Sequence, residues 1–223
     1  MKVIEFNLKQ HFTLVKSFFL RIINTDPAIE KNETVWQRAL NVYSKIIDNI
    51  SLKVAYKHVI PKKIEGKELV IDNITISCNA FEILNQTDVI SSFIYMMTIG
   101  ECKIDSKQIL DQLYCDAWGT AFIDAGRVLF KKHLINETEE VVSESFGPGY
   151  YGMNVSELNK FFNILNADIL NLHINQYGMM VPEKSSAGIF LELKQAGNFP
   201  SLACESCKGN PLGCHFCNIF IKT

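Results

Sequence analysis

The sequence predicts an α+β fold, because helical segments and antiparallel hairpins follow one another without the strand–helix–strand order of a parallel sheet. Apolar residues recur at helical spacing over 106–134, whereas residues 68–77 and 174–193 show strand patterns. Hydrophobic residues make up 48% of the 223 residues, and the formal net charge is −2. These values predict a packed globular domain and exclude a disordered or strongly nucleic-acid-binding chain.

We expect a cytoplasmic protein with no membrane partner. The longest apolar run, near residues 90–99, is interrupted by Ser91, Ser92 and Thr98, which leaves it far short of a membrane span. The first ten residues, MKVIEFNLKQ, lack the apolar core of a signal peptide. Three cysteines occur singly in apolar or helical surroundings, as buried thiols of cytosolic proteins usually do. These are Cys78, Cys102 and Cys115.

The first half of the chain is expected to be mixed helix and strand. Its expected elements are a helix at 11–24, a second helix after Asp26-Pro27 with an apolar stripe from Trp36 to Ile50, a hairpin at 68–77, a short helix at 81–84 and a buried strand at 92–98.

The second half begins with the longest periodic segment, residues 106–134, which predicts a long helix. Gly119 costs this helix about 1 kcal/mol relative to alanine, so we expect close packing to offset it. The other expected elements are a loop at 136–144, a helix capped by Ser156, and strands at 174–181 and 187–193 joined by a turn at Pro182–Ser185.

A glycine turn at residues 147–152 (GPGYYG) matches the G-x-G-x-x-G pattern of dinucleotide-binding loops. That pattern must follow a buried strand, but residues 139–145 are largely polar. Pro148 would also remove an N–H group from the phosphate cradle. We therefore reject a dinucleotide site. Residue types alone are typical of a surface turn, with Tyr150 and Tyr151 folded back on the core.

The order of several motifs resembles the activation domain of cobalamin-dependent methionine synthase. The glycine turn is followed by an amphipathic helix and by Met179-Met180-x-Pro182-x-Lys184-Ser185, which resembles the family's Met-x-Pro-x-Lys-Ser hairpin. Thr98-Ile99-Gly100 and residues 110–121 resemble two further family segments. The resemblance covers roughly residues 90–190. It implies a bent antiparallel sheet with flanking helices over residues 1–200, followed by a small cysteine-rich tail at 201–223.

The resemblance also implies a binding site for S-adenosylmethionine at Gly147, Pro148, Gly149 and Tyr150. Glycine lets a backbone approach a ligand closely, and a tyrosine face suits a sulfonium cation or an adenine ring. The family's arginine in this turn falls at Ser145, which supplies neither charge nor a bidentate fork. By residue type, Lys184 and Ser185 are typical of a solvated turn. No catalytic residue is singled out.

A four-cysteine cluster near the C-terminus is the strongest purely chemical signal. Two C-x-x-C pairs can place four thiolates on one tetrahedral centre. The predicted ligands are Cys204, Cys207, Cys214 and Cys217. Zinc and a [4Fe–4S] cluster both accept four thiolates, and the spacing does not separate them. A redox-active dithiol pair or unligated thiols are the alternatives.

The four histidines outside this tail are read as surface or packed residues, isolated from carboxylate and cysteine clusters. They are His11, His58, His133 and His173.

The function implied by the resemblance is reactivation of a corrinoid protein such as methionine synthase, with S-adenosylmethionine as methyl donor for reductive methylation of cobalamin. The chain shows no cobalamin-ligating histidine motif. The corrinoid is therefore expected on a partner, either a corrinoid-binding protein or a methionine synthase catalytic subunit, with an electron donor as a further partner. Two alternatives are a metal-stabilised interaction module that has lost S-adenosylmethionine binding, which Ser145 supports, and an iron–sulfur electron donor for a corrinoid methyltransferase.

Overall fold

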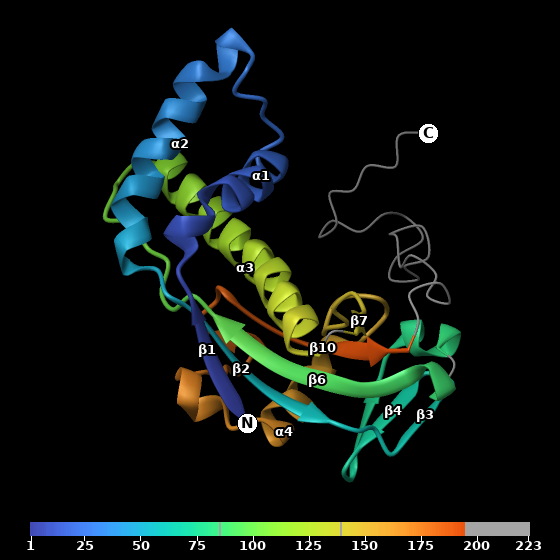
Figure 1. The fold of residues 1–223 in the computed structure, drawn as a ribbon. Coiled ribbons are helices and arrows are strands. Elements are labelled where there is room, and N and C mark those ends of the chain that lie inside the picture. Colours follow the sequence, from blue (N-terminus) through green and yellow to red (C-terminus); the bar gives the residue numbers. More distant parts are fainter. Residues whose placement is uncertain (85, 139, 195–223) are drawn as a thin grey trace.

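The computed structural model describes residues 1–84, 86–138 and 140–194. Its centre is a five-stranded sheet in the order β1-β2-β6-β10-β7, in which every neighbouring pair is antiparallel. The strands are β1 (Lys2–Phe6), β2 (Leu52–Val59), β6 (Val89–Thr98), β7 (Val141–Val142) and β10 (Ser185–Leu193). The sheet curls around the long helix that crosses it (Figure 1). This architecture confirms the predicted α+β fold with a bent antiparallel sheet.

Helix α3 (Ile109–Thr138) lies against one face of the sheet, and two further helices, α1 (Phe12–Ile22) and α2 (Glu33–Ile46), pack against α3 on the same side (Figure 1). Trp118 of α3 is fully buried at their meeting point, where its ring stacks on Phe19 with centroids 3.7 Å apart. Its indole N–H donates to the Ala39 carbonyl over 2.9 Å, so the polar atom of this large side chain is satisfied inside the core.

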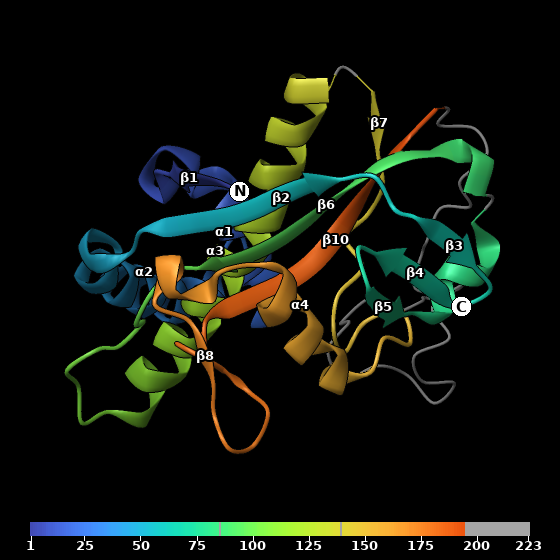
Figure 2. The same cartoon turned by 90° about the horizontal axis from the view of Figure 1, so that it is seen from below.

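A second core lies on the other face of the sheet. Figure 2 shows this face, which a small sheet and a short helix cover. The elements are β3 (Lys63–Glu65), β4 (Glu68–Ile71), β5 (Ile74–Ser77) and α4 (Leu158–Ile164). Successive residues of a strand point to opposite faces, so on β6 Tyr95 faces the helices while Ile94 and Met96 face the second core. Because both faces are covered, β6 is apolar along most of its length.

Most predicted elements are present, but the predicted loop at 136–144 is partly wrong. Helix α3 continues to Thr138, and β7 pairs with the end of β10. Glu137 stabilises the last turn of α3, because it forms an ion pair with Lys2 and accepts a 2.7 Å hydrogen bond from the Tyr56 hydroxyl. Strands β1, β2 and β3 were not predicted.

The predicted cap at Ser156 is also wrong. Asn154 occupies the capping position, and its side-chain oxygen accepts a 2.9 Å hydrogen bond from the Ser156 N–H. A 3₁₀ turn at Val155–Glu157 then leads into α4. Asparagine caps helices as well as serine does, so residue type alone could not choose between the two positions.

The predicted strand at 174–181 folds back on itself. β8 (His173–Ile174) pairs with β9 (Met180–Val181), and the Asn175 side chain accepts hydrogen bonds from the N–H groups of Tyr177 and Met179. Gly178 completes the reversal with φ +79°. Residues 182–185 therefore connect β9 to β10 without being the turn of a paired hairpin.

In the part of the chain that the structure describes, no helix is both long enough and apolar enough to cross a membrane. Residues 195–223 lie outside the described residues. The boundary between a domain at 1–200 and a tail at 201–223 therefore stays a prediction.

Candidate functional site

The glycine turn consists of two consecutive reverse turns. The Gly147 carbonyl accepts a 2.9 Å hydrogen bond from the Tyr150 N–H, with Pro148 and Gly149 in the two central positions. Gly149 has φ +87°, as the second central residue of a type II turn requires. A second turn over residues 150–153 follows directly and is closed by another 2.9 Å hydrogen bond. The turn is thereby folded tightly while Gly149 stays exposed.

Strand β10 anchors the beginning of this turn. Phe146 and Ile189 exchange two backbone hydrogen bonds of 2.9 and 2.7 Å. Gly147 then lies so close to β10 that an added Cβ would stand 2.6 Å from the Ala187 carbonyl oxygen. Glycine is therefore required at 147 by close approach of two backbones, and at 149 by its φ angle.

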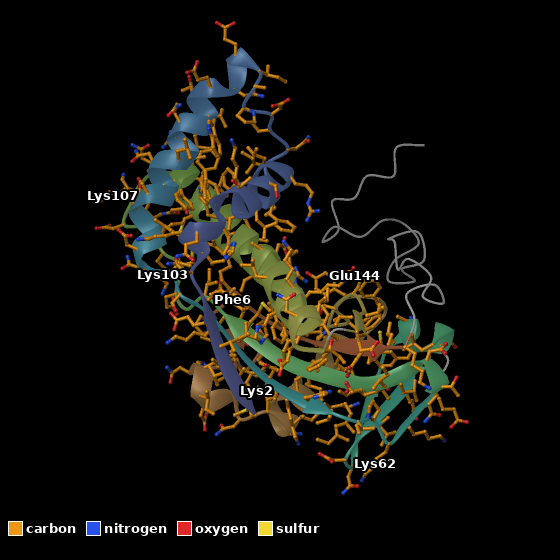
Figure 3. The ribbon with its side chains drawn as sticks, in the orientation of Figure 1. Lys2, Phe6, Lys62, Lys103, Lys107 and Glu144 are labelled. Carbon is orange, nitrogen blue, oxygen red and sulfur yellow. The ribbon has the colours of Figure 1, made fainter. Side chains whose placement is uncertain are left out.

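Helix α3 presents a row of polar side chains toward the turn and β10. Their spacing of three or four residues places them on one helix face. We call this row the α3 polar stripe; it comprises Asp116, Thr120, Asp124, Arg127 and Lys131. At one end, Lys131 pairs with Glu144 over 2.6 Å. Glu144, labelled in Figure 3, lies three residues before the glycine turn. The helical spacing of this stripe is visible in the sequence, but the stripe was not predicted.

Arg127 joins the α3 polar stripe to the glycine turn. Its guanidinium carbon lies 5.4 Å from the centroid of the Tyr150 ring, and the guanidinium also pairs with Asp124. The Arg127 side chain is 25% exposed. Burial lowers the pKa of the guanidinium, but the nearby Asp124, Tyr95 and Tyr150 outweigh it and raise that pKa. A permanent positive charge therefore sits beside the turn.

Ser145, where the family pattern has arginine, is used internally. Its hydroxyl lies 2.7 Å from the Tyr95 hydroxyl in β6, and burial raises the pKa of that tyrosine. The Ser145 hydroxyl also lies close to the backbone of β10, because a Cβ added to Gly188 would stand 2.7 Å from Ser145 Oγ. The positive charge at this turn thus comes from Arg127 of α3, a residue far from the turn in sequence.

Lys184 is not a solvated turn residue, contrary to expectation. Its side chain is 17% exposed, and its ammonium group contacts Asp116 Oδ1 over 2.6 Å and Thr120 Oγ1 over 3.1 Å. The stem of the side chain passes over Gly119, where a Cβ would stand 2.9 Å from it. The close packing expected at Gly119 is therefore confirmed. Lys184 of the β9–β10 connection thus contacts the α3 polar stripe at Asp116 and Thr120, the end opposite to Lys131.

Two histidines have carboxylate neighbours, so the expectation that all four are isolated is wrong. His133 lies 3.5 Å from Glu137 at i,i+4 spacing, a signal that the sequence contained. His58 Nε2 lies 2.6 Å from Ser91 Oγ and 3.4 Å from Glu192, and Ser91 also bonds to Glu192. In a serine hydrolase the serine and the carboxylate bind different nitrogens of the histidine ring. Here both partners lie at His58 Nε2, so these three residues do not form such a triad.

Within residues 1–84, 86–138 and 140–194, no group of three or more His, Cys, Asp or Glu side chains is placed to hold a metal ion. The four predicted cysteine ligands, Cys204, Cys207, Cys214 and Cys217, all lie outside the described residues. A zinc or iron–sulfur site there stays a prediction.

No family model matches the sequence. No curated protein matches it either. Among solved structures, the crystal structure of the MetH reactivation domain bound to AdoHcy matches with a TM-score of 0.62 and 9% sequence identity. The match covers 90% of this chain and 81% of that chain. At this identity the likeness concerns the fold and not the individual residues. This chain therefore has the fold of the MetH reactivation domain, in agreement with the activation-domain resemblance of its motifs.

Proposed function

We propose that this protein binds S-adenosylmethionine between the glycine turn and the α3 polar stripe and donates its methyl group to a corrinoid carried by a partner protein. The observation that carries the proposal is Arg127 held over Tyr150 at a turn that includes the exposed Gly149. The fold supports it, because the MetH reactivation domain of the matching structure is bound to AdoHcy, the demethylated form of the same molecule.

The charges of the site suit the amino-acid end of the ligand. The planar guanidinium of Arg127 matches a carboxylate, and the Asp124 carboxylate can accept hydrogen bonds from the ligand ammonium group. In the free protein these two side chains pair with each other. Binding would exchange that one pair for two pairs with the ligand. Partial burial of Arg127 strengthens its interaction relative to a fully solvated guanidinium.

The turn suits the rest of the ligand. Arg127 covers one face of the Tyr150 ring, and we place the sulfonium or the adenine of the ligand against the opposite face. Gly149 lets the ligand approach the backbone closely, since it has no side chain.

The chain's own residues bind and orient the methyl donor, while the corrinoid of the partner supplies the nucleophilic cobalt. An electron donor is needed to reduce the oxidised corrinoid. We propose that the partner is a corrinoid-binding protein or a methionine synthase catalytic subunit. A zinc or iron–sulfur site at the four C-terminal cysteines would belong to the same assembly.

Isothermal titration with S-adenosylmethionine tests the binding claim. We expect Arg127→Ala to weaken binding about tenfold or more, since losing a charge-assisted hydrogen bond costs about 1.5–3 kcal/mol. Arg127→Lys should bind with intermediate affinity, because it keeps the charge and loses the fork. The matched control is Arg21→Ala, which removes a guanidinium that lies 4.9 Å over the Phe18 ring on α1. Equal affinity in wild type and Arg127→Ala would refute the assignment.

Ser145 favours a second candidate, an interaction module that has kept the fold and lost the methyl donor. Its hydroxyl is already bonded to Tyr95 and brings no charge to the turn. This candidate predicts binding to the corrinoid protein with no measurable affinity for S-adenosylmethionine at millimolar concentration. A pull-down of the corrinoid protein, with and without S-adenosylmethionine, separates the two candidates.

A further inference from the structure

Two cysteines that look unrelated in the sequence meet in the structure. Cys102 lies in the segment 99–108 between β6 and α3, and Cys115 lies in the second turn of α3. Their sulfur atoms are 3.7 Å apart, and the Cys102 thiol also donates to the Cys115 carbonyl over 3.5 Å. From the sequence, both were expected to be single buried thiols.

The two thiols of the pair differ in exposure and in pKa. Cys115 is 3% exposed, whereas Cys102 is half-buried and faces the surface more openly. The hydrogen bond between the two thiols lowers the pKa of Cys115 and raises the pKa of Cys102. The charged groups that act on both thiols are the Lys184 ammonium, which favours a thiolate, and the Asp116 carboxylate, which opposes it. Lys184 and Asp116 pair with each other beside the thiols.

The segment that carries Cys102 has room to adjust. Residues 99–108 form neither helix nor strand, and Gly100 within them has φ +74°. A disulfide requires the sulfur atoms to approach to about 2.05 Å. A change of side-chain rotamer and a small shift of this irregular segment can supply that movement, whereas two thiols on rigid elements would be held apart.

We propose that Cys102 and Cys115 are a reversible dithiol–disulfide site. Cys102, the more exposed thiol, gives up its proton and attacks a small-molecule disulfide, which forms a mixed disulfide and releases one small thiol. Because the hydrogen bond to Cys115 raises the pKa of Cys102, this step should be slow at neutral pH and become faster as pH rises. The Cys115 thiolate then attacks the Cys102 sulfur and expels the second small thiol. One protein S–S bond forms, the two protons of the protein thiols pass to the released thiolates, and the small disulfide gains the two electrons that the protein loses.

Closing this bond ties the segment before α3 to the helix itself, next to Lys184 and Asp116 at one end of the α3 polar stripe. Oxidation should therefore fix the start of α3. The inference is independent of the proposed methyl donor site and holds whether or not S-adenosylmethionine binds.

Peptide mapping of the full chain tests the proposal. The protein is fully reduced, equilibrated with oxidised glutathione, alkylated without reductant and digested with trypsin. Lys103 and Lys107, which lie at the outer side of the molecule in Figure 3, separate the two cysteines in sequence. Trypsin therefore releases Cys102 on residues 68–103 and Cys115 on residues 108–127, unless a disulfide joins the two peptides. We expect the joined peptide, lighter by about 2 Da than the sum of its reduced parts.

Cys78 lies on the same tryptic peptide as Cys102, so it provides the control. The joined peptide should persist in Cys78→Ser and disappear in both Cys102→Ser and Cys115→Ser. In wild type, reduction with dithiothreitol should restore both alkylatable thiols. The proposal is overturned if both cysteines remain fully alkylatable after oxidation, if the joined peptide depends on Cys78, or if the bond forms with a cysteine of the C-terminal cluster instead.

Discussion

The guanidinium of Arg127 covers one face of the Tyr150 ring, with 5.4 Å between its central carbon and the ring centroid. This contact connects the helical layer to the glycine turn, because Arg127 belongs to α3 and Tyr150 ends the first reverse turn. It places a positive charge and an aromatic face side by side where the backbone is accessible. The proposed methyl donor site depends on that combination.

The Tyr150 ring, and not its hydroxyl, should matter for binding. We expect Tyr150→Phe to keep the affinity for S-adenosylmethionine within about threefold and Tyr150→Ala to weaken it about tenfold, because a cation–aromatic contact is worth about 0.5–2 kcal/mol. Tyr177→Ala is the control, since Tyr177 is 79% exposed on the β8–β9 turn. Titration of the three variants measures this. A loss in Tyr150→Phe equal to that in Tyr150→Ala would mean that the hydroxyl carries the effect.

Two glycines of the turn should be needed for different reasons. Gly147→Ala forces a Cβ against the Ala187 carbonyl oxygen, so we expect it to lower the free energy of unfolding by about 1–3 kcal/mol. In Gly149→Ala the added Cβ has only Val155 as a neighbour, at 3.9 Å. Its positive φ alone should therefore lower the free energy of unfolding, by about 1–2 kcal/mol. Urea denaturation measures both. A Gly147→Ala protein as stable as wild type would contradict the close approach to β10.

Stability should depend on Glu137 at neutral pH and lose that dependence in acid. The hydrogen bond from Lys2 is the main cause that lowers the pKa of Glu137, and the Tyr56 hydroxyl adds to it. A lowered pKa contributes stability above the unfolded-state pKa of about 4.3, and the contribution is lost as pH falls through the folded-state value. Glu137→Gln should therefore be less stable than wild type at pH 7, with a difference that shrinks below about pH 4.5.

Urea denaturation from pH 3 to pH 7 measures this difference. Glu65→Gln is the matched control, because its ion pair with Lys63 is exposed and such pairs contribute little. A Glu137→Gln difference that is constant with pH would show that the carboxylate charge is not its source.

The four C-terminal cysteines should hold metal without supporting the described domain. We expect replacement of Cys204, Cys207, Cys214 and Cys217 by serine to abolish bound zinc or iron. The melting temperature should change little, since each core of the described part of the chain already contains more than twenty buried residues. Metal analysis and the visible spectrum of anaerobically purified protein measure this, an iron–sulfur protein being brown. Metal retained by the serine variant, or absent from wild type, would contradict the assignment.

Periodicity was sufficient for the helices and for the central strand, because their apolar residues face two large cores. It failed where side chains hydrogen-bond to the backbone, as at Asn154 and Asn175, since such bonds leave no hydrophobic pattern. The candidate site was predicted only in part. The turn was visible as Gly147 to Tyr150, but Asp124 and Arg127 resemble an ordinary exposed helical pair, and only the fold brings them to Tyr150.

The crystal structure of this protein with bound S-adenosylhomocysteine tests the central claim most directly. Our account predicts the amino-acid carboxylate of the ligand within hydrogen-bonding distance of the Arg127 guanidinium, its ammonium group facing Asp124, and its nucleoside against the backbone of residues 147–150. A ligand bound elsewhere on the molecule, or no bound ligand at millimolar concentration in a crystal that leaves the turn accessible, would contradict it.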